Sequence, residues 1–257
     1  MVTLGGVLRD GRSATGSVRL TLTGEFELFV GGERRTVPHS VERVLAYLAL
    51  TERPVSRTKL AGILWFGATE KRAANNLRTT LWRLGRTCGQ LVSAGPDRLV
   101  LSSAVKVDAA ELSGLAQRLI HDPAPDDLGD LPSLVACADL LPDWDDRWVA
   151  ADRERLRLLR LEALERAASA LIERHCLGDA LVAALASVQS EPLRESCRRL
   201  VVEVHVTEGN VAEALRSYNE YRALLRDELG IEPSDLMQRL IEPLGLWSRG
   251  DGGVPGS

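Results

Sequence analysis

The sequence predicts a mainly α-helical protein, with a small domain of short strands and three helices first and an all-helical domain after it. Strand-like segments and a hairpin signal occur in the first part, whereas helical periodicity dominates the second. The charge also changes sign. Residues 1–108 carry 16 Lys and Arg against 9 Asp and Glu, a net of +7, and residues 109–257 carry 16 against 27, a net of −11. Two domains with different partners are expected, and only the first suits a polyanion.

The first elements are short strands. Residues 1–17 have the composition of a disordered leader. Residues 18–30, "VRLTLTGEFELFV", alternate apolar and polar residues with the period of a half-buried strand. Gly31 and Gly32 form a turn, and "ERRTVP" makes a further short strand. Two or three antiparallel strands are therefore expected before the first helix.

Three helices and a hairpin follow. The segment "SVERVLAYLALTE" has Ser40 placed as its N-cap, and "SRTKLAGILW" has Ser56 in the same role. The third helix covers "TEKRAANNLRTTLWRLGR", residues 69–86. The segments "QLVSA" and "RLVLSS", joined by "GPD", then indicate a β-hairpin. This order is that of a winged helix, a helix-turn-helix variant with a hairpin wing, and it assigns residues 18–108 to such a domain.

The second part is nearly all helix-forming. "AAELSGLAQRLI" is helical, "HDPAPDDLGDLP" is a Pro- and Asp-rich link, and helices continue to Pro243. The pairs Ala180/Ala214 and Leu181/Leu215 are each 34 residues apart, the period of tetratricopeptide repeats. Coincidental spacing of small apolar residues is the alternative. A tetratricopeptide-like helical-repeat domain is expected over 109–245, followed by a disordered tail over 246–257.

The third helix is amphipathic and its polar side is basic. The apolar stripe expected from the spacing is Ala74, Leu77, Leu81, Leu84 and Cys88. Arginine can pair bidentately with guanine, asparagine can pair with adenine, and a threonine methyl can touch thymine. The two adjacent asparagines are poor helix formers, which favours a reading role. The predicted base contacts are Arg72, Asn75, Asn76, Thr79 and Arg83. A solvated basic face is the alternative.

Further cations are placed to meet the DNA backbone or the minor groove. Arg57 and Lys59 lie in the first turn of the helix that Ser56 is expected to cap. Cations in the first turn of a helix oppose its dipole, so a phosphate partner would explain them. An arginine in the hairpin is a candidate for a wing contact. The residues predicted to make these contacts are six cations and one aromatic residue: Arg57, Lys59, Lys71, Arg78, Trp82, Arg86 and Arg98. Each has an ordinary surface role as its alternative.

The sequence disfavours several other classes of protein. No apolar run has the length of a membrane span, and the start of the chain has no secretory signal. The four cysteines and four histidines have no metal-ligand spacing, and no HExxH, GxSxG or GxxxxGK[ST] motif occurs. We therefore expect no cofactor, no metal, no membrane partner and no enzymatic activity, in a cytoplasmic, nucleoid-associated protein.

The chain resembles the Streptomyces antibiotic regulatory protein family. The resemblance rests on the winged-helix order and on "LLPDWDDRWVAADRERL", "SEPLRES" and "GNVAEALRSYNEYRALLRDELGIEPS" in the second part. The first part resembles the OmpR-type DNA-binding domain and the second the bacterial transcriptional activator domain. The resemblance is to a small member without a phosphorylatable receiver domain or an ATPase domain. Its Trp82-Arg83-Leu84 departs from relatives that have a small polar residue first.

This resemblance implies a transcriptional activator that binds tandem direct repeats in double-stranded DNA upstream of promoters. It implies two protomers bound head to tail, recruitment of the RNA polymerase holoenzyme, and target genes of secondary metabolism, such as antibiotic biosynthesis. A protein-protein adaptor with a degenerate winged helix is the alternative. An adaptor would not need an acid-free basic helix face.

Overall fold

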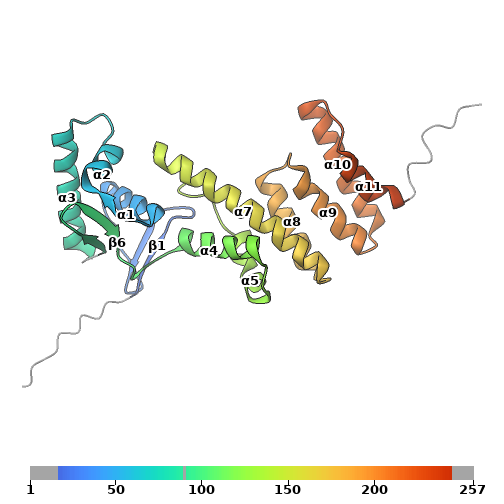
Figure 1. Ribbon diagram of the computed structural model, residues 1–257, viewed down its shortest axis with the longest axis horizontal. Helices are drawn as coiled ribbons and strands as arrows, with labels where there is room; N and C mark the ends of the chain where they lie inside the picture. Colours follow the sequence, from blue (N-terminus) through green and yellow to red (C-terminus); the bar gives the residue numbers. More distant parts are fainter. Residues whose placement is uncertain (1–16, 89–90, 245–257) are drawn as a thin grey trace, which may run out of the picture. The chain divides into compact units, whose positions relative to one another are not determined.

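The computed structural model describes residues 17–88 and 91–244, which form two compact units. The first contains the described residues up to Ala110 together with Leu141–Asp143, and the second contains 111–140 and the described residues from Trp144 onward. The expectation of a mainly helical chain with a small N-terminal sheet region is confirmed (Figure 1). The expected tail over 246–257, and nearly all of the expected leader, lie outside the described residues.

The first sheet of the N-terminal unit has the strand order β3-β2-β1-β7. Its strands are β1 (Val18–Thr21), β2 (Glu27–Val30), β3 (Glu33–Arg34) and β7 (Val105–Val107). The stretch 18–30 is thus two strands rather than one, because the chain turns at Gly24, whose φ of 87° suits glycine. The parallel pairing of β7 with β1 was not expected from the sequence.

Three helices and a second sheet complete this unit. The elements are α1 (His39–Thr51), β4 (Val55–Ser56), α2 (Arg57–Leu64), α3 (Glu70–Cys88), β5 (Val92–Ala94) and β6 (Arg98–Leu101). The hairpin predicted from "GPD" is confirmed as β5 and β6, and β4 pairs with the other edge of β6. Leu99 of β6 is fully buried, and each of the three helices also contributes buried leucines.

The two predicted helix caps have different outcomes. Ser56 is confirmed, because its Oγ accepts a hydrogen bond from the backbone N–H of Lys59 at 3.2 Å. Ser40 is wrong as a cap, since α1 already begins at His39. Pro38 is the N-cap residue there, and its carbonyl accepts from the N–H of Val41 at 2.7 Å. The fixed φ of proline presets this start without a side-chain cap.

A buried carboxylate ties the end of β7 to the chain after β1. Asp108 Oδ1 accepts from the N–H of Leu22 at 2.8 Å, and Oδ2 accepts from the N–H and hydroxyl of Thr23 at 3.0 and 2.6 Å. Asp108 Oδ1 also accepts from the N–H of Ala109 at 2.7 Å. These bonds join segments that are 85 and 86 residues apart in sequence, which explains why the carboxylate tolerates burial.

The second unit is built from helices. They are α4 (Asp108–His121, beginning in the first unit), α5 (Pro125–Gly129), α6 (Leu131–Val135), α7 (Arg147–Glu173), α8 (Leu177–Ser190), α9 (Glu195–Thr207), α10 (Val211–Leu229), α11 (Asp235–Ile241) and the 3₁₀ turn η1 (Glu242–Leu244). The expected link at 121–132 is wrong, because it contains α5 and the start of α6. Proline is favourable in the first turn, where both helices carry one.

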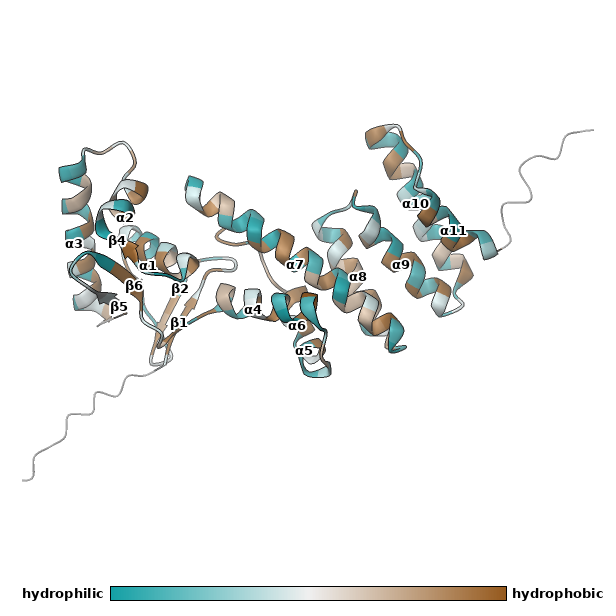
Figure 2. Cartoon of the chain, in the orientation of Figure 1, coloured by the Kyte–Doolittle hydropathy of each residue, from teal (hydrophilic) through white to brown (hydrophobic). Residues whose placement is uncertain are grey.

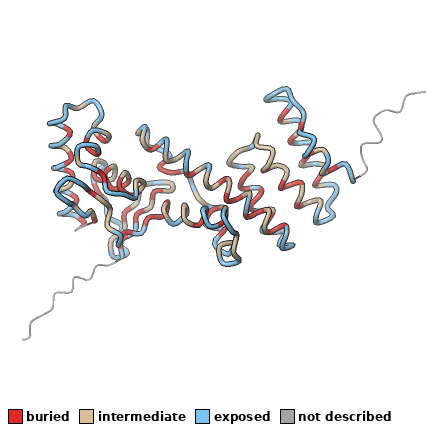
Figure 3. Tube along the Cα trace, in the orientation of Figure 1, coloured by how far each residue is buried: buried red, intermediate tan, exposed pale blue. Residues whose placement is uncertain are grey.

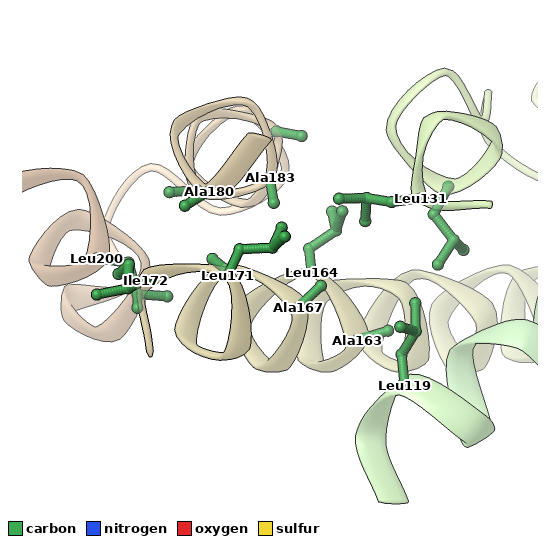
Figure 4. Close-up of a cluster of buried hydrophobic side chains, with 14 of the residues drawn as sticks. Leu119, Leu131, Ala163, Leu164, Ala167, Leu171, Ile172, Ala180, Ala183 and Leu200 are labelled. Carbon is green, nitrogen blue, oxygen red and sulfur yellow. The ribbon is translucent and has the colours of Figure 1, made fainter. Parts of the chain in front are cut away.

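Consecutive helices of this unit pack against one another. α8 contacts α7 and α9, α10 contacts α9, and α11 returns to α9. Leu164, Leu171 and Ala183 meet between α7 and α8 in the main core cluster (Figure 4). Ala180 and Ala214, the pair spaced by 34 residues, are both fully buried, which shows why small residues recur at that interval.

No described helix is both long and apolar enough to cross a membrane. Within residues 17–88 and 91–244, no three His, Cys, Asp or Glu side chains are grouped so that they could hold a metal ion.

Candidate nucleic-acid interface

The orientation of α3 differs from the one expected from its sequence. Its buried residues are Ala73, Leu77, Thr80, Leu84 and Cys88. The expected positions Ala74 and Leu81 are exposed and half-buried, so these two assignments are wrong. At about 100° per residue, the observed stripe lies about 40° around the helix from the expected one.

Tertiary packing explains this rotation. α3 packs against both α1 and α2, so its buried stripe lies between two supports. Thr80 is only 3% exposed, whereas Leu81 is half-buried at the edge of the stripe. Hydrophilic and hydrophobic residues both occur along α3 (Figure 2), and buried positions recur along an otherwise exposed helix (Figure 3).

The rotation changes which residues lie at the centre of the exposed face. The direction opposite the buried stripe falls at Asn75, with Trp82 and Arg86 about 20° to either side, on a wheel of about 100° per residue. Trp82 is 59% exposed and lies near the centre of this face. Asn76, expected to face DNA, is half-buried at the edge. Of the two adjacent asparagines, Asn75 is therefore the better placed for an external ligand.

This exposed face of α3 is strongly basic. Within the described chain, none of its five cations forms an ion pair with a carboxylate. The only acid of α3 is Glu70, in its first turn. All five cations are exposed: Lys71, Arg72, Arg78, Arg83 and Arg86. Their charge is thus available to an external anion.

Two polar contacts order the side chains near Asn75. Arg78 Nη2 donates to Asn75 Oδ1 at 2.6 Å. The hydroxyl of Thr79 donates to the backbone oxygen of Asn75 at 3.0 Å, one turn back along the helix. Thr79 is itself exposed, and its hydroxyl is engaged in this bond.

Trp82 and Arg86 form a cation–π pair. The guanidinium carbon of Arg86 lies 4.9 Å from the centroid of the Trp82 ring. Both side chains are exposed, so the ring restricts Arg86 without burying it. Such contacts reduce the conformational freedom that the arginine loses on binding.

The start of α2 adds two cations beside this face. Arg57 is half-buried and Lys59 is exposed, both in the turn that Ser56 caps. A groove of about 460 Å³ lies between α2 and α3 and is lined by both Arg57 and Arg78. Small residues make up much of its lining, among them Gly62, where an added Cβ would meet no atom within 4 Å. Sequence reasoning missed this groove, whose signal is the run of small residues on α2 and α3.

The hairpin places Arg98 next to the start of α2. Arg98 is exposed at the first position of β6 and lies opposite Ser56 in the β4–β6 register. The N–H of Arg57 donates to the carbonyl of Asp97 at 2.9 Å, which fixes the hairpin turn to α2. Arg57, Lys59 and Arg98 therefore come together around one end of α2.

Comparison with known proteins places the chain in a family. Residues 101–244 match the model of the bacterial transcriptional activator domain. The regulatory protein AfsR of Streptomyces coelicolor is 29% identical over 245 residues, covering 89% of this chain and 24% of that protein. The AfsR of Streptomyces griseus is 27% identical over 241 residues, covering 88% and 24%. The chain thus spans about a quarter of the length of these relatives.

A solved structure shares the fold. The structure of Mycobacterium tuberculosis EmbR in complex with a low affinity phosphopeptide superposes with a TM-score of 0.67 at 21% identity. The match covers 89% of this chain and 65% of that one. Because the family model matches more than half of its residues, the chain belongs to the bacterial transcriptional activator domain family.

Proposed function

We propose that the protein is a sequence-specific DNA-binding transcriptional activator. Residues 18–108 are then an OmpR-type winged-helix domain, with α3 as the recognition helix and β5–β6 as the wing. The observation that carries this proposal is the exposed face of α3, where five cations that form no ion pair with any described carboxylate accompany Asn75 and Thr79. A helix of this width fits the major groove, and its arginines and amide suit base edges.

The proposed DNA-contacting residues form two groups, one that contacts base edges and one that contacts the backbone or the minor groove. Arg72, Asn75, Asn76, Thr79 and Arg83 contact base edges, although the half-burial of Asn76 restricts it to the margin of the interface. The backbone and minor-groove contacts come from Arg57, Lys59, Lys71, Arg78, Trp82, Arg86 and Arg98. The grouping of Arg57, Lys59 and Arg98 at one end of α2 supports this second set, because a phosphate there would also meet the positive end of the helix dipole.

The helical domain, 109–245, is proposed to bind the RNA polymerase holoenzyme. Stacked helices offer an extended surface for a protein partner, and a net charge of −11 over residues 109–257 disfavours binding of this part to DNA. The family resemblance supports tandem direct repeats, a second protomer bound head to tail, and target genes of secondary metabolism. A cytoplasmic location at the nucleoid follows from this role.

A selection from random duplex DNA tests the proposal. The intact protein should enrich a motif that occurs twice in tandem, spaced near one helical turn. Arg83→Ala should lose the base preference at one position of that motif. Arg53→Ala is the matched control, since Arg53 is an exposed cation of the same unit outside α3. Enrichment of no motif would refute sequence-specific binding and favour a protein-protein adaptor.

A further inference from the structure

The amide of Asn75 has a defined orientation on the face of α3. Its Oδ1 accepts a hydrogen bond of 2.6 Å from Nη2 of Arg78. A guanidinium has donors and no acceptor, so the amide oxygen, and not the nitrogen, must face it. The Nδ2 group of Asn75 therefore points away from Arg78, and both of its N–H bonds remain available.

The neighbours of these two residues favour this pairing over any other within α3. Residues three and four apart are the neighbours on a helix surface. At these positions Asn75 has Lys71, Arg72 and Arg78, which are all donors, together with Thr79, whose hydroxyl donates to the Asn75 backbone. Arg78 in turn has the apolar neighbours Ala74 and Leu81 and the donor Trp82. Asn75 Oδ1 is thus the one side-chain acceptor that α3 offers to Arg78 at helical spacing.

This arrangement changes the base that Asn75 suits. To pair with adenine, asparagine must accept from N6 through its oxygen and donate to N7 through its nitrogen. Here the oxygen is already engaged by a charge-assisted hydrogen bond, and the outward groups are Nδ2–H and the remaining N–H bonds of Arg78. The guanine edge presents two acceptors, N7 and O6, which match a surface of donors.

We infer that Arg78 is a positioning residue that makes Asn75 select guanine rather than adenine. The inference rests on the proposed DNA-binding function and deepens it, because Arg78 then determines specificity besides contacting the backbone. It replaces the expectation from sequence that an asparagine on this helix reads adenine.

The test uses the intact protein and the duplex that it selects. Asn75→Ala first identifies the base pair read by Asn75, as the position where discrimination is lost. Dissociation constants are then measured for duplexes with guanine or adenine at that position. The wild type should prefer guanine by about fivefold to a hundredfold, the usual discrimination of a good side-chain pair with a base.

Two substitutions separate positioning from charge. Arg78→Leu releases Oδ1, so the preference should fall to parity or turn to adenine, whereas Arg78→Lys keeps a donor and should keep guanine. Lys71→Leu is the matched control: it removes the same charge one turn from Asn75, and it should weaken both duplexes equally. The three substituted side chains are exposed, and circular dichroism verifies that each of the four variants is folded.

The possible outcomes are distinct. A wild-type preference for adenine, the absence of any Asn75-dependent position, or an Arg78→Leu protein with an unchanged guanine preference would overturn this inference and leave the proposed DNA binding standing. Failure of the wild type to select any motif would overturn both proposals.

Discussion

The indole of Trp82 and the guanidinium of Arg86 are stacked, with the guanidinium carbon 4.9 Å from the ring centroid, at the centre of the exposed face of α3. An exposed cation–π contact contributes about 0.5–1 kcal/mol. Trp82→Ala should therefore weaken DNA binding by about twofold to fivefold. Trp82→Phe should preserve most of the affinity, because the ring face is kept. Fluorescence anisotropy measures both, and equal losses for Ala and Phe would refute a stacking role.

Arg83 and Lys59 should respond differently to truncation. Arg83→Ala should relax base choice at one position by about 1–3 kcal/mol, because a base-edge contact is lost. Lys59→Ala should weaken binding to all sequences by a similar factor and lower the salt dependence, because a phosphate contact is lost. Competition against single-base variants of the selected duplex distinguishes the two patterns. A uniform effect of Arg83→Ala would place it at the backbone instead.

Removal of the Asp108 carboxylate should destabilise the N-terminal unit. Asp108→Ala leaves the buried N–H of Leu22 without its acceptor, at a cost of about 1–3 kcal/mol for that group alone. Hydrogen exchange at the Leu22 amide measures the effect locally, which avoids assuming that both units unfold together. Asp122→Ala, at an exposed position, is the control and should change nothing. Unchanged protection of Leu22 would contradict the structural role of Asp108.

The carboxylate of Glu232 should make stability depend on pH at the end of α10. Hydrogen bonds of 2.5 Å from Arg222 and Arg226 lower the pKa of Glu232 to about 2, below its ordinary value of about 4.3. A lowered pKa in the folded state gives stabilisation that is present above the ordinary value and lost as pH falls toward 2. Glu232→Gln should thus be less stable than the wild type at pH 6 and indistinguishable from it at pH 2.

Thermal melts of both proteins across this pH window make that comparison. The residues are solvent-exposed, so the difference at pH 6 should also shrink as salt is added. A difference that persists at pH 2 would show that Glu232 acts through something other than its charge.

The cysteines should differ in reactivity. Burial, followed by the hydrogen bond of 2.9 Å to Glu165, raises the pKa of Cys197 to about 12, so little thiolate forms. Cys176 is exposed. Iodoacetamide at pH 8 should therefore label Cys176 in the folded protein and Cys197 only after unfolding, as read by mass spectrometry. Equal labelling rates would show that the α7–α9 packing opens readily.

Much of the local structure follows from the sequence because local physics determines it. The Ser56 cap, the GPD hairpin and the approximate limits of the first three helices depend on side-chain capping, turn chemistry and periodicity over a few residues. The predictions that were wrong concern features that depend on partners distant in sequence, or segments for which two local structures have similar energy. Pro125 and Pro132, for example, fit equally well in a link and in the first turn of a helix.

The candidate interface likewise has some features that the sequence predicts and others that depend on tertiary packing. The basic composition of residues 69–86 is evident in the sequence, and the structure exposes its arginines. The rotation that buries Thr80 and centres Trp82 arises from packing against both α1 and α2, which a helical wheel does not contain. The hydrogen bond between Asn75 and Arg78 is likewise a matter of side-chain geometry.

The affinity ratio between the selected duplex and a scrambled duplex of equal length, measured over a range of salt concentrations, tests the central claim most directly. If α3 reads base edges, the selected duplex should bind about a thousandfold more tightly or better at physiological salt. Both affinities should fall with salt, because the cations of α3 and α2 displace counterions from phosphates. Equal affinities for the two duplexes at every salt concentration would contradict sequence-specific recognition by this helix.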